Sequence, residues 1–218
     1  RTRAVAAAAA IALVLSIPVP EAPPAEGEAP RGVLAAVFDR KLVPLWASGL
    51  LFAVAIAAYF ILLKTYVLSI GVGSIGDFFA AYAITACLLR LFAGSLPERA
   101  GPKRVLAFAM GALAAGLVLL AFATSRTDLA IAGVLAGAGH GYTFPILLGL
   151  VVSRARPNER GAALAVFTAL FDAGTLLGGP MLGAVVEAAS YPAMFVFAAA
   201  LAACGFVLLV VLDRRFIR

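Results

Sequence analysis

Few side chains in this sequence could do chemistry, and they stand inside long apolar runs. Asp172 lies near the middle of one run, and the single histidine, His140, lies near the middle of another. An ionisable group in such a run is costly to place in hydrocarbon, so each is a candidate proton or substrate group. Thr168 and Thr175 stand four residues before and three residues after Asp172, on the same helical face. We expect this face to line a watery cavity.

A second polar cluster surrounds His140. Thr143 shares its helical face, and Tyr142 stands beside it. Tyr59, on an earlier run, is a separate candidate that could face the cavity. Each has a structural alternative. Asp172 would be a buried carboxylate satisfied by hydroxyls, His140 a tautomer held by a backbone carbonyl, and Tyr59 a packing residue. The sequence leaves these alternatives open.

The composition argues against other kinds of site. Cys87 and Cys204 are isolated and lack the spacing of metal ligands, and the chain has neither a Ser/His/Asp set nor a phosphate-binding loop. We therefore predict no enzyme activity, no cofactor and no metal. The net charge of +6 comes from short basic clusters without interleaved aromatic residues, so no nucleic-acid partner is expected.

The elements that must position these residues are membrane-spanning helices. Hydrophobic residues make up 64% of the 218-residue chain and charged residues only 13%, which leaves no polar shell for a soluble domain. Runs of about 20 apolar residues are long enough to cross a bilayer. The sequence predicts an all-α membrane protein with six complete transmembrane helices, at 42–66, 74–96, 102–124, 128–152, 160–187 and 191–212.

The segment before these helices is divided into two parts. Residues 1–17 are apolar and Ala-rich but short for a span, and are either the end of a truncated preceding transmembrane helix or a secretory signal. Residues 18–40 begin with five prolines and three glutamates by residue 30, which predicts a flexible linker. Residues 41–218 form the six-helix unit.

Basic residues set the expected orientation. They gather in alternate connections, whereas the opposite side carries only Lys64 and Arg126. The basic side is expected to be cytoplasmic and to contact anionic lipids, with the linker and the C-terminus on that side. A cleaved signal would invert this arrangement, so the truncated helix is preferred. The clustered basic residues are Arg31, Arg40, Lys41, Arg99, Lys103, Arg104, Arg154, Arg156, Arg160, Arg214, Arg215 and Arg218.

Glycines repeat at helical spacing in two of the runs. Gly133, Gly137 and Gly141 recur every fourth residue, and the next run carries the pairs Gly174/Gly178 and Gly179/Gly183. Such stripes let helix backbones meet closely in lipid. They predict that the fourth and fifth spans pack against other helices.

The most specific motif lies between the second and third spans. Its constrained positions follow the order glycine, acid, base, glycine, base, base: Gly94, Glu98, Arg99, Gly101, Lys103 and Arg104. Gly94 would allow a close helix approach and Gly101 a backbone reversal. Arg90, just before the motif, would snorkel to the interface or pair with Glu98.

This motif resembles the loop signature of the major facilitator superfamily, and the resemblance extends over the six-helix unit. The Gly137–Pro145 and Pro157–Gly161 segments are loosely similar to drug and sugar efflux members. The resemblance implies the C-terminal half of a bacterial inner-membrane transporter. Such a half would move a small organic solute by alternating access, coupled to protons, with a missing N-terminal half as partner. The alternative is a six-span subunit or scaffold that transports nothing and binds a partner.

Overall fold

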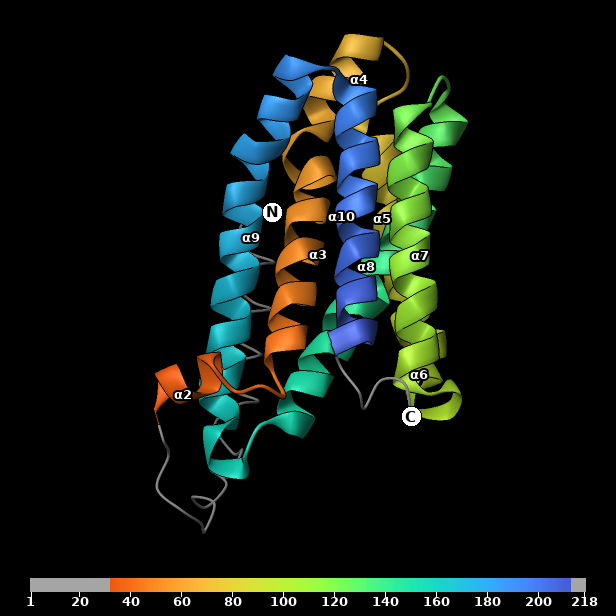
Figure 1. Ribbon diagram of the computed structural model, residues 1–218. Coiled ribbons are helices and arrows are strands. Elements are labelled where there is room, and N and C mark those ends of the chain that lie inside the picture. Colours follow the sequence, from red (N-terminus) through yellow and green to blue (C-terminus); the bar gives the residue numbers. More distant parts are fainter. Residues whose placement is uncertain (1–31, 213–218) are drawn as a thin grey trace, which may run out of the picture.

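The computed structural model describes residues 32–212, which are helical with short connections and contain no strand (Figure 1). Six of the helices are long and apolar enough to cross a membrane. In chain order the helices are α2 (Val33–Val37), α3 (Val43–Ile61), α4 (Leu63–Ile70), α5 (Ile75–Ala93), α6 (Leu96–Ala100), α7 (Pro102–Ala121), α8 (Arg126–Arg154), the short 3-10 helix η1 (Pro157–Glu159), α9 (Arg160–Ala188) and α10 (Tyr191–Leu212).

The six predicted spans are confirmed as α3 with α4, α5, α7, α8, α9 and α10, and the differences are local. The first span is divided at Leu62 into α3 and α4. The short helix α2 lies within the range predicted to be linker. It is apolar and free of proline, and the indole N–H of Trp46 donates to the carbonyl oxygen of Val37 at 3.1 Å. The end of that range is therefore ordered, because it has its own packing contacts.

Some predictions concern residues outside the described part of the chain. These are the preceding helix at 1–17, the linker up to residue 31, and the basic tail at Arg214, Arg215 and Arg218. They stay predictions.

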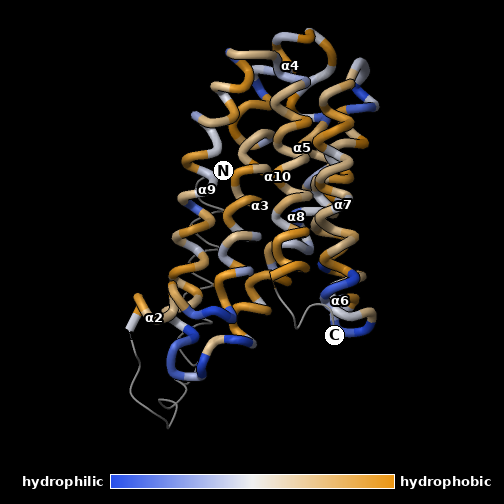
Figure 2. Tube along the Cα trace, viewed as in Figure 1, coloured by the Kyte–Doolittle hydropathy of each residue, from blue (hydrophilic) through white to orange (hydrophobic). Residues whose placement is uncertain are grey.

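The long helices form a bundle in which α5, α8, α7, α10, α3 and α9 each contact the next in that order. Apolar residues cover the middle of the bundle, and the hydrophilic residues collect near its two ends (Figure 2). The contact between α3 and α8 closes the interior. Because lipid offers no hydrophobic drive for association, close packing must hold these helices together.

Glycines provide that packing at two contacts. A Cβ atom at Gly137 would lie 3.0 Å from Cα of Tyr82 on α5, and one at Gly133 would also meet the α5 backbone, at Phe78. On α9, a Cβ at Gly174 would lie 2.8 Å from Cβ of Ala53 on α3. The prediction that both spans pack through glycines is confirmed at these positions. At Gly183 a Cβ would meet nothing within 4 Å, so the second α9 pair is not a packing stripe along its whole length.

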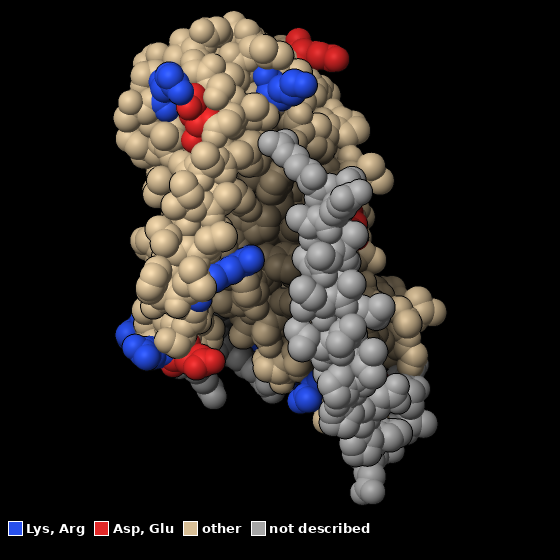
Figure 3. Space-filling model, turned by 180° about the vertical axis from the view of Figure 1, so that it is seen from behind, with Lys and Arg blue, Asp and Glu red and all other residues tan. Residues whose placement is uncertain are grey.

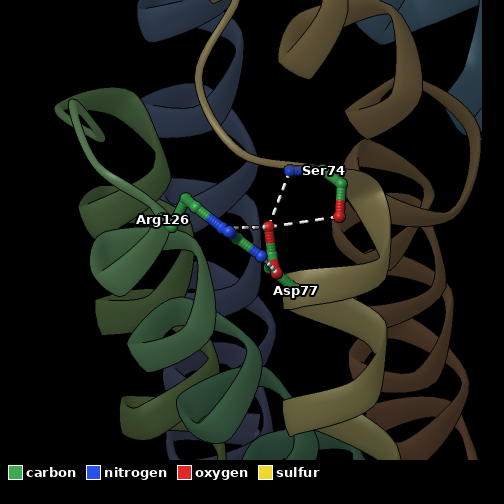
Figure 4. A network of polar contacts seen from close by, with 3 residues as sticks. All are labelled: Ser74, Asp77 and Arg126. Carbon is green, nitrogen blue, oxygen red and sulfur yellow. Dashed lines mark hydrogen bonds and ion pairs between the residues drawn. The ribbon is translucent and has the colours of Figure 1, made fainter.

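An ion pair ties the first turns of α5 and α8 together (Figure 4). The guanidinium of Arg126 donates to both carboxylate oxygens of Asp77, at 2.8 and 3.2 Å. The same carboxylate accepts from the backbone N–H of Ser74 at 2.7 Å and so caps α5. Arg126 is largely exposed, so this pair fixes geometry more than it adds stability.

The face turned away from the viewer in Figure 1 is hollowed in the space-filling view (Figure 3). Most charged side chains on this face lie toward its two ends. Most residues of α5 and α9 are left exposed or half-buried in the described structure. An exposed apolar surface of this extent is typical of helices that meet lipid or another protein.

Candidate functional site

Three helices meet at the ring of His140. Its Nδ1 atom on α8 lies 2.9 Å from the hydroxyl of Tyr82 on α5 and 3.2 Å from the hydroxyl of Tyr59 on α3. Tyr59 is fully buried, whereas Tyr82 and His140 are half-buried. Tyr59 and His140, which the sequence offers as separate candidates, meet in this geometry. The alternative of a backbone carbonyl on Nδ1 does not fit, because the two partners are phenols.

A single Nδ1 atom can make only one strong hydrogen bond, since it carries either one lone pair or one hydrogen. The two tyrosine hydroxyls therefore compete for it, or share it at reduced strength. The other ring nitrogen, Nε2, has no hydrogen bond within residues 32–212. His140 can thus keep one nitrogen engaged with the protein and offer the other to a proton or a ligand.

Tyr82 is the site residue that sequence reasoning missed. It lies eight residues before Arg90, two helical turns away on the same side of α5. Its spacing from Arg90, which is within the same predicted span, could have marked Tyr82 as a site candidate.

Aromatic rings enclose this polar centre. The rings of Phe52 and Phe60 lie edge-on to His140 at centroid distances of 5.4 and 5.8 Å, and Phe144 lies at 6.4 Å. Phe144 in turn contacts Phe171 on α9 at 4.9 Å. Packed rings of this kind exclude water from the side of Tyr59 and hold the imidazole in one orientation.

Asp172 lies apart from this centre, on the exposed face of α9. Within the described part of the chain its carboxylate makes no hydrogen bond or ion pair, and it does not contact His140. It lines an open depression of about 610 Å³ together with Ile61, Phe171, Thr175, Leu176, Gly179 and Pro180. The predicted face of Asp172 and Thr175 is therefore accessible from one side of the bundle.

The two threonines of this face do not satisfy the carboxylate. Thr168 donates to the carbonyl oxygen of Leu164 at 3.0 Å, and Thr175 donates to that of Phe171 at 3.1 Å. Both are bonds within α9 itself. Neither threonine therefore supports the alternative in which neighbouring hydroxyls donate hydrogen bonds to the carboxylate of Asp172.

The remaining candidates on α8 point elsewhere. The hydroxyl of Tyr142 donates to the carbonyl oxygen of Ala93 at the end of α5, at 2.8 Å. Thr143 is fully buried, and its hydroxyl has no hydrogen-bond partner among the residues described. Neither residue touches His140 through a hydrogen bond, although all three are close in sequence.

The loop motif forms the turn between α5 and α7. Gly101 has a φ of +89°, and Pro102 begins α7, as the expected backbone reversal requires. Gly94 has a different role from the one predicted, because a Cβ there would meet the carbonyl oxygen of Arg90 in its own segment at 2.7 Å and no neighbouring helix. Glu98 and Arg99 are exposed, and in the described residues no ion pair joins Glu98 to Arg90.

Arg90 instead borders a cavity of about 400 Å³ between α5, α6, the start of α7 and the second half of α8. The same cavity is lined by Gly141, the residue that follows His140 on α8. Across residues 32–212 no cluster of His, Cys, Asp or Glu could hold a metal ion. The candidate groups are the phenols of Tyr59 and Tyr82 with the imidazole of His140 at one centre, and Arg90 and Asp172 at separate cavities.

Comparison with known proteins agrees with this architecture. The chain is 32% identical over 124 residues to an uncharacterized MFS-type transporter of Salmonella typhimurium, and 34% identical over 125 residues to uncharacterized MFS-type transporters of Burkholderia mallei and Burkholderia pseudomallei. These matches cover 57% of this chain but only 32% of the Salmonella protein and 30% of the Burkholderia proteins.

The sequence profile of the Major Facilitator Superfamily matches residues 45–217. This range includes the loop motif and all six long helices except the first two residues of α3. This superfamily consists of transporters, in line with the prediction that the chain has no enzyme activity. The chain belongs to the Major Facilitator Superfamily.

Proposed function

We propose that this chain is the C-terminal half of a transporter that moves a small organic solute across a bacterial inner membrane, coupled to protons. The two halves would rock about a central site and expose it to either side in turn. The family and the transporter names of its relatives support transport as the activity. Efflux is the direction suggested by the motif resemblance.

The observation that carries this proposal is the placement of titratable groups on a face left open by the six helices. His140 is half-buried, and its Nε2 accepts and donates no hydrogen bond among residues 32–212, whereas Asp172 is exposed on α9 beside an open depression. In a soluble protein such groups would face water, but here they stand at the middle of membrane-spanning helices. A second six-helix unit seated over this face would enclose them in a cavity.

Proton coupling is tested first at Asp172, the carboxylate at the middle of α9 that lines the open depression. In the full-length protein, Asp172→Asn should abolish the pH dependence of transport in proteoliposomes, because the amide cannot bind and release a proton. Glu187→Gln, on an exposed position of the same helix, is the matched control and should keep the pH dependence. An unchanged pH profile in Asp172→Asn would eliminate this role.

The orientation is tested with single cysteines at the two ends of the bundle. Glu98 lies in the basic loop and Thr127 in the first turn of α8, and both are exposed. In a variant without Cys87 and Cys204, Thr127→Cys should react with an impermeant maleimide added to intact cells. Glu98→Cys should react only after the inner membrane is opened. Equal labelling of both from outside would contradict a cytoplasmic basic side.

A further inference from the structure

The cavity beside Arg90 carries one charge in an otherwise uncharged lining. Two of its lining residues besides Arg90 have polar side chains, Tyr142 and Ser153, and both hydroxyls already donate to backbone carbonyls, of Ala93 at 2.8 Å and of Leu150 at 3.0 Å. The rest of the lining is glycine, proline, leucine and isoleucine. Arg90 is therefore the side chain with unused hydrogen-bond donors in this cavity.

No acidic side chain of the described residues neutralises Arg90. Asp77 is held by Arg126, and Asp128 accepts from Thr124 and Ser125 at the start of α8. Glu98, which is nearest in sequence, makes no ion pair with it. Arg90 is exposed at the edge of this cavity. In a membrane-spanning helix a guanidinium is still costly unless a negative group pairs with it.

The cavity also has the position and size of a ligand site. Arg90 stands three residues before the end of α5, about 4.5 Å along the helix, opposite Pro145 to Ser153 of α8. Gly141, the residue that follows His140 on α8, also lines the cavity, so the cavity adjoins the aromatic centre described above. A volume of about 400 Å³ is within the range of small-molecule pockets.

We propose that this cavity binds an organic monoanion, a carboxylate on a compact apolar body, whose negative charge pairs with Arg90. The planar guanidinium suits a carboxylate because it can donate two parallel hydrogen bonds. Leu89, Ile146 and Leu150 would contact the apolar body. This inference rests on the proposed function in one respect, because it names the class of the transported solute.

The test uses three ligands that share a naphthalene ring and differ in charge: the anion 2-naphthoate, the neutral 2-naphthamide and the cation 2-naphthylmethylamine. Binding to the full-length protein is measured in phosphatidylcholine nanodiscs. The wild type should bind the carboxylate at least about tenfold more tightly than the amide, as one charged hydrogen-bond pair provides. The amine should bind more weakly still, because its positive charge is repelled.

Substitution of Arg90 should remove the charge preference and little else. In Arg90→Gln, carboxylate affinity should fall to that of the amide, while amide affinity stays unchanged. Arg90→Lys should keep a preference for the carboxylate, reduced because an ammonium is a point charge. Lys64→Gln removes the same charge at an exposed position at the other end of the bundle and should change neither affinity.

Several results would overturn the proposal. The first two are equal affinity for the three ligands in the wild type and an unchanged preference for the carboxylate in Arg90→Gln. The third is loss of naphthoate binding when phosphatidylglycerol is added to the nanodiscs, because Arg90 would then bind a lipid headgroup. No binding of any of the three would mean that another part of the protein fills the cavity. Naphthoate that binds but does not cross proteoliposome membranes would leave the anion site intact and contradict transport instead.

Discussion

Replacing Gly137 with alanine should destabilise the bundle by about 1–3 kcal/mol, the usual cost of forcing an extra methyl group into a packed contact. The added Cβ would meet the backbone of Tyr82, including its Cα at 3.0 Å, and backbone cannot rotate away as a side chain can. Gly133→Ala should act in the same direction against Phe78. The measurement is the thermal unfolding midpoint of the purified full-length protein in detergent.

Gly141 provides a matched control on the same stripe. A Cβ there would lie 3.7 Å from Ala86, which is an ordinary contact. Gly141→Ala should therefore leave the midpoint unchanged or raise it slightly, because alanine favours helix over glycine. Equal midpoints for Gly137→Ala and Gly141→Ala would show that α5 and α8 are not packed as described.

The same substitution should also disturb the site. Tyr82 supplies both the backbone that meets Gly137 and the hydroxyl that meets His140. A shift of α5 away from α8 lengthens the 2.9 Å contact between that hydroxyl and Nδ1. We expect Gly137→Ala to lose transport at temperatures where the protein is still folded.

The second large effect is expected when both tyrosines at His140 lose their hydroxyls. Either Tyr82→Phe or Tyr59→Phe alone should have a small effect, because the remaining phenol can take the whole hydrogen bond to Nδ1. The double variant leaves Nδ1 without a partner in a ring-lined environment, which costs about 1–3 kcal/mol. Transport and unfolding should therefore change far more than the sum of the two single effects.

This non-additivity is measured as a double-mutant cycle. Tyr66→Phe is the matched control, since Tyr66 is buried and its hydroxyl donates to the carbonyl oxygen of Leu120 at 2.7 Å, away from His140. Tyr66→Phe should add to Tyr82→Phe without coupling. Simple additivity of Tyr59→Phe and Tyr82→Phe would mean that the two hydroxyls do not share Nδ1.

The six spans could be predicted from the sequence because membrane crossing is a local requirement. Each helix satisfies its own backbone hydrogen bonds, so length and hydropathy of a single run decide whether it spans. The division of the first span at Leu62 was missed, since the runs on both sides of it are equally apolar. Likewise, Gly101 and Pro102 were predictable because a positive φ and a helix start depend on adjacent residues alone.

The candidate site was predicted only in part. Tyr59 and His140 were found as polar residues at depth, but they are 81 residues apart, and nothing local shows that they meet or that Tyr82 joins them. The close helix approach predicted at Gly94 is not seen, because the sequence before a turn does not show whether a glycine faces another helix or its own segment. Asp172 and His140, predicted at similar depth, lie on different helices without a contact between them.

The amino-acid sequence alone was enough to predict the six spans, the glycine stripes and the motif that carries the family resemblance. All of these depend on periodicity and on neighbours within a few residues. The pairing of Tyr59 and Tyr82 at one imidazole nitrogen, and the position of Arg90 in an apolar cavity, came from the way α3, α5 and α8 pack. Which side chains meet across helices depends on the rotation and depth of each helix, and those are set by contacts between residues far apart in the chain.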